Sequence, residues 1–307
     1  MSLNTLLTSR AVIAEMYNTL TMAEASWVDR YAMKVTSRQT TENYAWLGMV
    51  PTMREWVGGR MAKGLRENTW SITNKDYEAT LKVLTKELRQ DAGNQLELRI
   101  SELARRVLSY PATLMSAKIL AGSTTACYDG QNFFDTDHAE GSSGSQNNDL
   151  TGAAATATNP TVQELRDAIL ASMQAILGFK DDQGEPMNED ARQFEVMVPN
   201  IYWATAIQAL GAVTLGGGET NVLASMDGFK INLVNNTRLT WTDAFAVFRT
   251  DGRTKPFILQ EEVPITVSAV AEGSELEFNE ETHHYGVRWS GALDYGFWQH
   301  ACLYTFT

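Results

Sequence analysis

The stretch "NKDYEATLKVLTKELRQDAGNQLELRISELARRVLSYPATLMSAKILAG", residues 74–122, decides the fold because its hydrophobic period changes part-way along. Apolar and polar side chains first alternate, as in a half-buried β-strand, with the apolar ones at Tyr77, Ala79, Leu81 and Val83. Apolar residues then recur at i, i+4, i+7 and i+11, one face of an α-helix, at Leu96, Ile100, Leu103 and Val107. This strand and long helix, together with a mixed helix and strand segment and a strand-rich C-terminus, predict an α+β fold.

The strand pattern extends back towards Arg54. Glycines interrupt the first half of residues 54–84, and Trp70 and Ile72 alternate with polar residues in the second half. We interpret this segment as a long two-stranded ribbon. An isolated ribbon is barely stable in water, so it must pack on something else. In the helix that follows, Pro111 removes one backbone hydrogen bond and predicts a kink or a restart.

The rest of the chain mixes helices and strands without an internal repeat. Residues 1–50 begin with helical spacing and then lose any single period, which suggests a disordered arm or a segment that lies against something else. A helix is predicted over 159–177, where Leu165, Ile169, Met173 and Ile176 form the apolar face. Short strands dominate from residue 241 to the end.

Composition and charge exclude several classes of protein. The 307 residues are 44% hydrophobic with eight tryptophans, and no apolar run reaches the roughly 20 residues of a membrane span. The N-terminus lacks the pattern of a signal peptide, so we expect a cytoplasmic product whose Cys127 and Cys302 are free thiols. A net charge of −12 argues against nucleic-acid affinity. Residues 1–106 carry +3 and residues 107–307 carry −15, which indicates either a solvated acidic surface or a basic part that lies on a neighbouring copy.

The loop "CYDGQNFFDTDHAEGSSGSQNND", residues 127–149, holds the first candidate for chemistry. Asp135, Asp137 and His138 could bind a divalent metal, because carboxylate and imidazole suit Mn, Fe or Zn. The alternative is that Phe133 and Phe134 anchor the loop in a core or interface while the aspartates make turns.

Two further segments give weaker signals. His283 and His284 are adjacent in a predicted strand, so their side chains point to opposite faces and do not readily share a metal. The glycine-rich "LGGGET", residues 215–220, matches neither a P-loop nor a dinucleotide fingerprint and favours a mobile tip. No GxSxG, HExxH or CxxC occurs, which leaves little support for an enzyme.

Four segments together resemble the Mu-type major head subunit family of tailed phages. They are "WLGMVPTMREWVGGR" (46–60), "NKDYEATLKV" (74–83), "CYDGQNFFDTDH" (127–138) and "FEVMVPN" (194–200). The resemblance implies a Hong Kong 97-type capsid fold and a non-enzymatic shell protein without cofactor or metal. It assigns an N-terminal arm to 1–53, an E-loop ribbon to 54–84, the peripheral-domain spine helix and following loop to 85–159, an axial domain to 160–238, and peripheral-domain C-terminal strands to 239–307.

The function implied by the resemblance is that of a structural major capsid protein. Its copies would form pentamers and hexamers and then an icosahedral head, assembled in the bacterial cytoplasm, that encloses DNA without sequence-specific binding. A separate scaffold protein and a portal are expected as partners, and no association with a membrane is expected. An encapsulin-like compartment of the same fold, a metal-dependent hydrolase, and a tail or connector protein remain as alternatives.

The expected subunit contacts follow from the same resemblance. The arm and ribbon would lie on the adjacent subunit, with tryptophan and arginine as anchors, and the glycine-rich tip would lie near the capsomer axis. The predicted interface residues are Arg54, Trp56, Arg60, Lys63, Arg66, Trp70, Tyr77, Phe133 and Phe134; the predicted axis residues are Gly216, Gly217 and Gly218.

Overall fold

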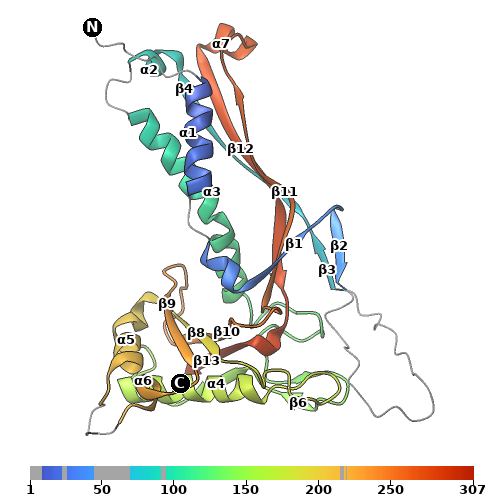
Figure 1. The fold of residues 1–307 in the computed structure, drawn as a ribbon, viewed down its shortest axis with the longest axis vertical. Coiled ribbons are helices and arrows are strands. Elements are labelled where there is room, and N and C mark those ends of the chain that lie inside the picture. The colour runs from blue at the N-terminus through green and yellow to red at the C-terminus, as the bar shows by residue number, and fades with distance from the viewer. Residues whose placement is uncertain (1–8, 23–25, 45–69, 91–94, 215–217, 219) are drawn as a thin grey trace, which may run out of the picture.

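The computed structural model describes residues 9–22, 26–44, 70–90, 95–214, 218 and 220–307. These residues form an elongated upper part, which contains the longest helix and a four-stranded sheet, and a lower part built on a five-stranded sheet (Figure 1). In the part of the chain so described, no helix combines the length and the apolar character needed to cross a bilayer.

The upper sheet has the strand order β1-β11-β12-β4. β11 and β12 form a long antiparallel hairpin, β4 is antiparallel to β12, and β1 is parallel to β11. From Lys75 to Val83 of β4 the apolar side chains are buried or half-buried and the polar ones are exposed, as the alternation predicts, whereas Leu84 at the end of the strand is exposed. The strands are β1 Ala32–Thr36, β4 Lys75–Leu84, β11 Phe257–Val270 and β12 Thr282–Tyr295.

The described strands of the predicted ribbon over 54–84 pair with strands outside that segment, and its residues 54–69 lie outside the described residues. β4 pairs with β12 from Lys75 to Leu84, so this half of the segment is an edge strand of the upper sheet. β3 (Trp70–Thr73) pairs instead with β2 (Thr41–Tyr44), and Tyr44 lies opposite Trp70. Residues 44 and 70, which flank the segment 45–69, therefore lie side by side.

The long helix α3 (Gln95–Leu120) continues as one helix through Pro111, so it does not restart there. Its predicted apolar stripe faces inward: Leu96 and Ile100 are buried, and Leu103 and Val107 pack at the edge of the same cluster. The stripe meets α1 (Ser9–Met22) and the upper sheet, which explains why the helix needs an apolar face.

The described part of the expected N-terminal arm over 1–53 packs on its own chain. Val12 and Met16 of α1 are fully buried against the chain's own α3 cluster, and β1 joins the upper sheet. Tyr31 donates a hydrogen bond to Glu195 of the lower sheet, and both side chains are buried. Residues that lack a core nearby in sequence obtain one from distant segments of the same chain.

The lower sheet has the order β7-β13-β10-β8-β9. Its central strands β8 and β10 are almost wholly buried, and α4 packs on β10 and β13. The predicted C-terminal group 239–307 is thus divided, because β11 and β12 belong to the upper sheet while β10 and β13 belong to the lower one. The elements are β7 Asp149–Gly152, α4 Val162–Gly178, β8 Gln193–Val198, β9 Lys230–Asn235, β10 Ala244–Arg249 and β13 Ala301–Phe306.

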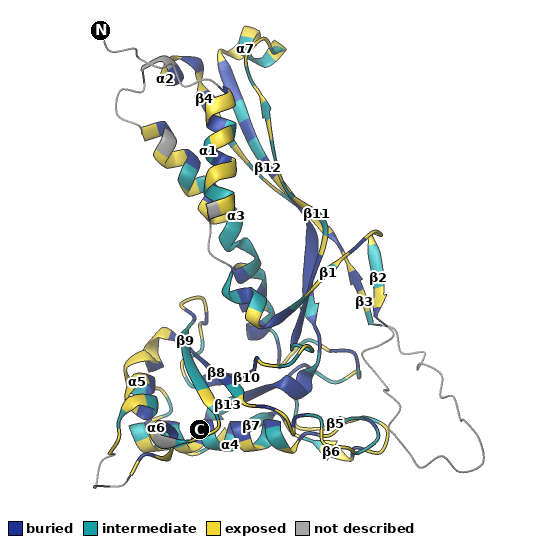
Figure 2. Ribbon diagram, viewed as in Figure 1, coloured by how far each residue is buried: buried dark blue, intermediate teal, exposed yellow. Residues whose placement is uncertain are grey.

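The main hydrophobic core lies where the two parts meet, and buried residues concentrate in both sheets there (Figure 2). Phe257 of β11 contacts Phe248 of β10 and Phe133 of the loop after α3, so aromatic rings join the sheets. The remaining short elements are η1 Trp27–Arg30, α2 Thr85–Gln90, β5 His138–Ala139, β6 Ser145–Gln146, η3 Asn200–Tyr202, α5 Trp203–Gly211, α6 Val222–Ser225, α7 Glu275–Glu280 and η4 Trp298–His300.

Candidate functional site

The predicted metal candidates of the loop after α3 do not come together. A carboxylate oxygen of Asp135 accepts hydrogen bonds from the backbone and side-chain nitrogens of Asn132, both at 3.2 Å. Asp137 is exposed and accepts from the Ser145 hydroxyl at 3.3 Å. His138 is fully buried and turns towards other partners. The two aspartates therefore shape turns, as the alternative interpretation predicts, and the hydrolase site based on these three residues is wrong.

His138 instead belongs to a buried cluster with Cys127 and Asp129. Its Nδ1 lies 2.6 Å from one carboxylate oxygen of Asp129, and the Cys127 thiol donates to the other at 3.0 Å. The possible ligand atoms of the three residues lie within 4.8 Å of one another. Burial above all, and then the Asp129 charge, raises the pKa of the Cys127 thiol, which keeps it protonated. Because nucleophilic attack uses the thiolate, Cys127 is not set up as a nucleophile, and the hydrogen bonds that join the three side chains fit a structural role.

Asn148 connects this cluster to the C-terminal strands. Its amide nitrogen donates to the carbonyls of Phe133 at 2.9 Å, Ala301 at 3.3 Å and Trp298 at 3.5 Å. Its amide oxygen faces His138 Nε2 at 3.1 Å, so that nitrogen is a donor. Sequence reasoning missed Asn148, which lies in a stretch of polar residues typical of an exposed loop. It also missed Asp129, for which the Asp-Gly pair signals only a turn.

The prediction that Phe133 and Phe134 contact a neighbouring subunit is corrected by their burial. Phe133 and Phe134 are 0% and 1% exposed, and Phe133 stacks on Tyr295 with ring centroids 4.6 Å apart. Both rings are enclosed by their own chain, so they are not surface contacts for a neighbour. The loop is anchored in the core, which is the other possibility that the sequence allowed.

The adjacent histidines of β12 have different surroundings. His283 is buried and its Nε2 lies 3.0 Å from Glu277 of α7, whereas His284 is half-buried. Ser9 of α1 also lies 3.5 Å from His283 Nδ1. These contacts hold the end of the β11–β12 hairpin against α1.

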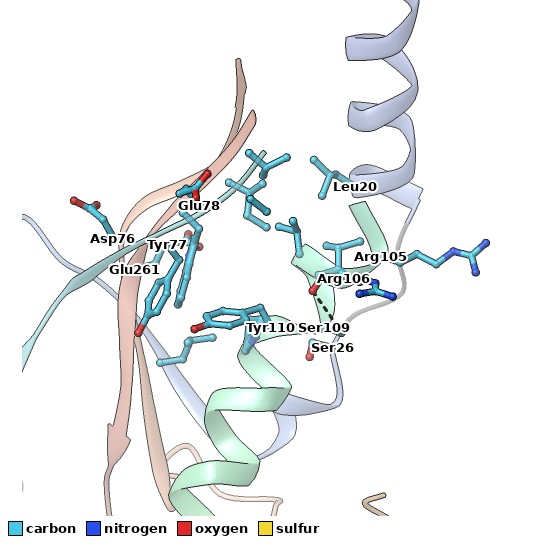
Figure 3. A pocket seen from close by; sticks show the side chains of 18 of the residues that line it. Leu20, Ser26, Asp76, Tyr77, Glu78, Arg105, Arg106, Ser109, Tyr110 and Glu261 are labelled. Atoms are coloured by element: carbon cyan, nitrogen blue, oxygen red, sulfur yellow. Dashed lines mark hydrogen bonds between the residues drawn. The ribbon is translucent and has the colours of Figure 1, made fainter. Parts of the chain in front are cut away.

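A groove of about 990 Å³ separates α3 from the upper sheet (Figure 3). Tyr77 of β4 lines it and stacks on Trp289, with ring centroids 5.3 Å apart, and it also contacts Tyr110 of α3. Leu103 and Val107 continue the apolar wall, and Arg105 and Arg106 lie at its rim. The predicted interface residue Tyr77 thus lines an open, partly aromatic surface.

The sequence of the chain matches the model of a known protein family. The family described as the Mu-like prophage major head subunit gpT matches residues 6–162 and 224–305. The chain belongs to this family.

Relatives of this head-subunit chain have matching names. It is 33% identical over 139 residues to the major capsid protein of Escherichia phage Mu, which covers 45% of this chain and 44% of that protein. It is 36% identical over 110 residues to the Mu-like prophage FluMu major head subunit of Haemophilus influenzae, which covers 36% of each chain. The matches thus span less than half the length of these curated relatives.

The solved structures show the same capsid fold. The procapsid of bacteriophage JBD30 contains a chain that aligns with 97% of this one and is covered to 73%, with a TM-score of 0.58 and 23% identity. The Hong Kong 97-type α+β fold expected for a head subunit is therefore confirmed.

Of the remaining predicted contact residues of this head subunit, the structure describes Trp70 and Gly218. Trp70 is half-buried beside the main core. Gly218 has a positive φ of 85° between α5 and α6, where Thr214 and Thr220 form a bridge. The others lie outside the described residues: Arg54, Trp56, Arg60, Lys63, Arg66, Gly216 and Gly217.

Proposed function

We propose that this chain is the structural major capsid protein of a tailed phage or prophage, and that its copies assemble into capsomers and a closed icosahedral head. The observation that carries the proposal is the family match, which covers both the N-terminal and the C-terminal portion of the chain. The capsid fold over nearly the whole chain supports it independently. A shell function also accounts for a site region made of packing contacts rather than reactive groups.

The proposed mechanism is repeated contact between identical chains. Contacts that close a ring and then a shell must be heterologous, so each copy offers two different surfaces. We propose that residues 45–69 provide one of them, because the β2–β3 pairing fixes both ends of this segment at Tyr44 and Trp70. Its arginines and tryptophans are the residue types in which interface energy concentrates. Many weak contacts in one shell then add up through effective concentration.

The proposed partners are further copies of this chain, a separate scaffold protein and a portal, with DNA enclosed without sequence-specific contacts. The net charge of −12 supports the last point, because it disfavours tight binding to phosphates. Capsomer-axis contacts by Gly216, Gly217 and Gly218 are proposed on the family resemblance.

An encapsulin-like compartment is the alternative with the same fold. The fold alone does not separate the two, and the family match favours the phage head. Purified particles from phage-producing cells distinguish them: the proposal expects nuclease-protected DNA inside, whereas a stoichiometric protein cargo without DNA would contradict it.

A further inference from the structure

The tip of the β11–β12 hairpin, residues 272–281, combines strong negative charge with one exposed aromatic ring. It contains five glutamates and no basic residue. Phe278 of α7 is 89% exposed, more than any other large hydrophobic side chain among the described residues. Exposure of a phenylalanine to water is unfavourable, so a ring held in this position favours a docking contact.

The tip is a formed structure and not a loose loop. The Ser274 hydroxyl accepts from the backbone nitrogen of Glu277 at 3.2 Å and so caps α7. The Glu277 carboxylate accepts from the backbone nitrogen of Gly273 at 2.7 Å and lies 3.0 Å from His283. Lys82 of β4 holds Glu280 at 2.8 Å. Phe278 is thereby presented on a fixed base.

A complementary surface lies on α3. A shallow hollow of about 520 Å³, here called the basic hollow, has an apolar floor and a mostly basic rim. Leu98, which is 69% exposed, lies there with the half-buried Leu81 and Leu103. The rim carries one acid, Glu102, and three exposed arginines: Arg99, Arg105 and Arg106.

The charges on the two surfaces are available for a partner. Arg106 pairs with Glu102, but among the described residues neither Arg99 nor Arg105 has an ion pair. On the tip, Glu275 is exposed and likewise has no ion pair among the described residues. Because both Phe278 and Leu98 are exposed, the tip does not occupy the basic hollow of its own chain.

We propose that the tip of one copy docks into the basic hollow of a second copy, with Phe278 on the leucine floor and Glu275 beside Arg105. This occupant is selected because the acidic tip and the basic rim have opposite charges, and because the exposed Phe278 ring matches the apolar floor of the basic hollow. Tip and hollow differ, so the contact is heterologous and leaves a free tip on one copy and a free hollow on the other. The inference rests on the proposed capsid function and assigns one of its contacts.

A charge-swap cycle tests the pairing in the full chain, with scaffold protein co-expressed if assembly requires it. Arg105→Glu and Glu275→Lys should each raise the protein concentration needed for assembly about tenfold, because like charges then face each other. The double variant should restore assembly, since every copy carries both changes. Phe278→Ala should weaken assembly, while its exposed neighbour Asn279→Ala should not.

The outcomes separate the two proposals. Thermal melting of unassembled variants should match the wild type, because all four side chains are exposed. Wild-type shells together with normal assembly of both single charge variants would overturn the tip–hollow contact alone. Loss of assembly in both single variants without rescue in the double variant would also overturn it and indicate a different partner, such as scaffold. A wild-type chain that never assembles would contradict the capsid function and this contact together.

Discussion

His138 stacks face to face on Trp298, with ring centroids 3.9 Å apart and an interplanar angle of 8°. The contact joins the loop after α3 to the segment that precedes β13. At the edge of the same imidazole, Nδ1 lies 2.6 Å from a carboxylate oxygen of Asp129. The histidine of the most conspicuous polar motif in the sequence is therefore part of the core.

Removal of His138 should destabilise the fold. His138→Ala deletes one member of a buried, hydrogen-bonded pair and leaves the Asp129 oxygen that faced it without a partner, which typically costs about 3–5 kcal/mol. Asp137→Ala is the matched control, because this exposed carboxylate should contribute less than about 0.5 kcal/mol. Urea denaturation of the unassembled chain measures both. Equal stability of the two variants would show that the buried cluster does not hold the loop.

His300 should make the fold sensitive to acid. Burial, followed by the charges of Arg249 and Lys255, lowers the pKa of His300 to about 3, so the folded ring stays neutral between Thr254 and Asn188. In the unfolded chain a histidine titrates near pH 6.5. The unfolded state therefore binds the proton first, and stability falls as the pH drops from about 6.5 towards 3 by at most about 1.4 kcal/mol per unit.

His300→Gln should remove this contribution. The variant will lose some stability at neutral pH, but its unfolding free energy should decline less steeply between pH 6 and 4. Chemical denaturation at several pH values gives both slopes. Parallel curves for variant and wild type would mean that another group dominates the acid response.

Charge reversal in the segment between β2 and β3 should impair assembly without unfolding the chain. Arg60→Glu places a negative charge in the segment that is proposed to contact a neighbouring copy, and most of the acidic charge of each copy lies in residues 107–307. Charge complementarity fixes partner and register, so the reversal should oppose the contact. Sedimentation should show fewer capsomers or shells, while circular dichroism stays unchanged. Normal shell yield from this variant would remove Arg60 from the proposed contact.

High salt should weaken assembly if opposite charges on different copies hold it together. Residues 1–106 carry +3 and residues 107–307 carry −15, and salt screens pairs that remain partly exposed. Light scattering across a salt series should show assembly shifting to higher protein concentration. Assembly that is indifferent to salt would indicate that apolar contacts dominate.

The sequence predicted the elements that depend on local period. The alternation around Tyr77 and the stripe through Leu96 and Ile100 identify β4 and α3, because burial of one face imposes a period of two or 3.6. The hydrophobic period of a strand does not, however, indicate which other strand it pairs with. The strand that pairs with β4 lies about two hundred residues away, so the local period could not identify it.

The buried polar contacts were less accessible to prediction. Asn148 is fully buried because several backbone carbonyls and a histidine surround it, and this environment exists only after the C-terminal strands fold over the loop. Adjacent residues such as Asn147 and Ser145 have similar composition but are not fully buried. The exposure of Phe278 could not be predicted either, because helix α7 is too short for an amphipathic period to show which of its faces is exposed.

Negative-stain electron microscopy of the purified chain, with its mass from size exclusion and with scaffold protein supplied, tests the capsid function most directly. The proposed function predicts closed shells, or rings with five-fold and six-fold symmetry. A chain that remains a monomer or dimer with scaffold present, or that forms only tubes or rings of a single tail-like size, would contradict it.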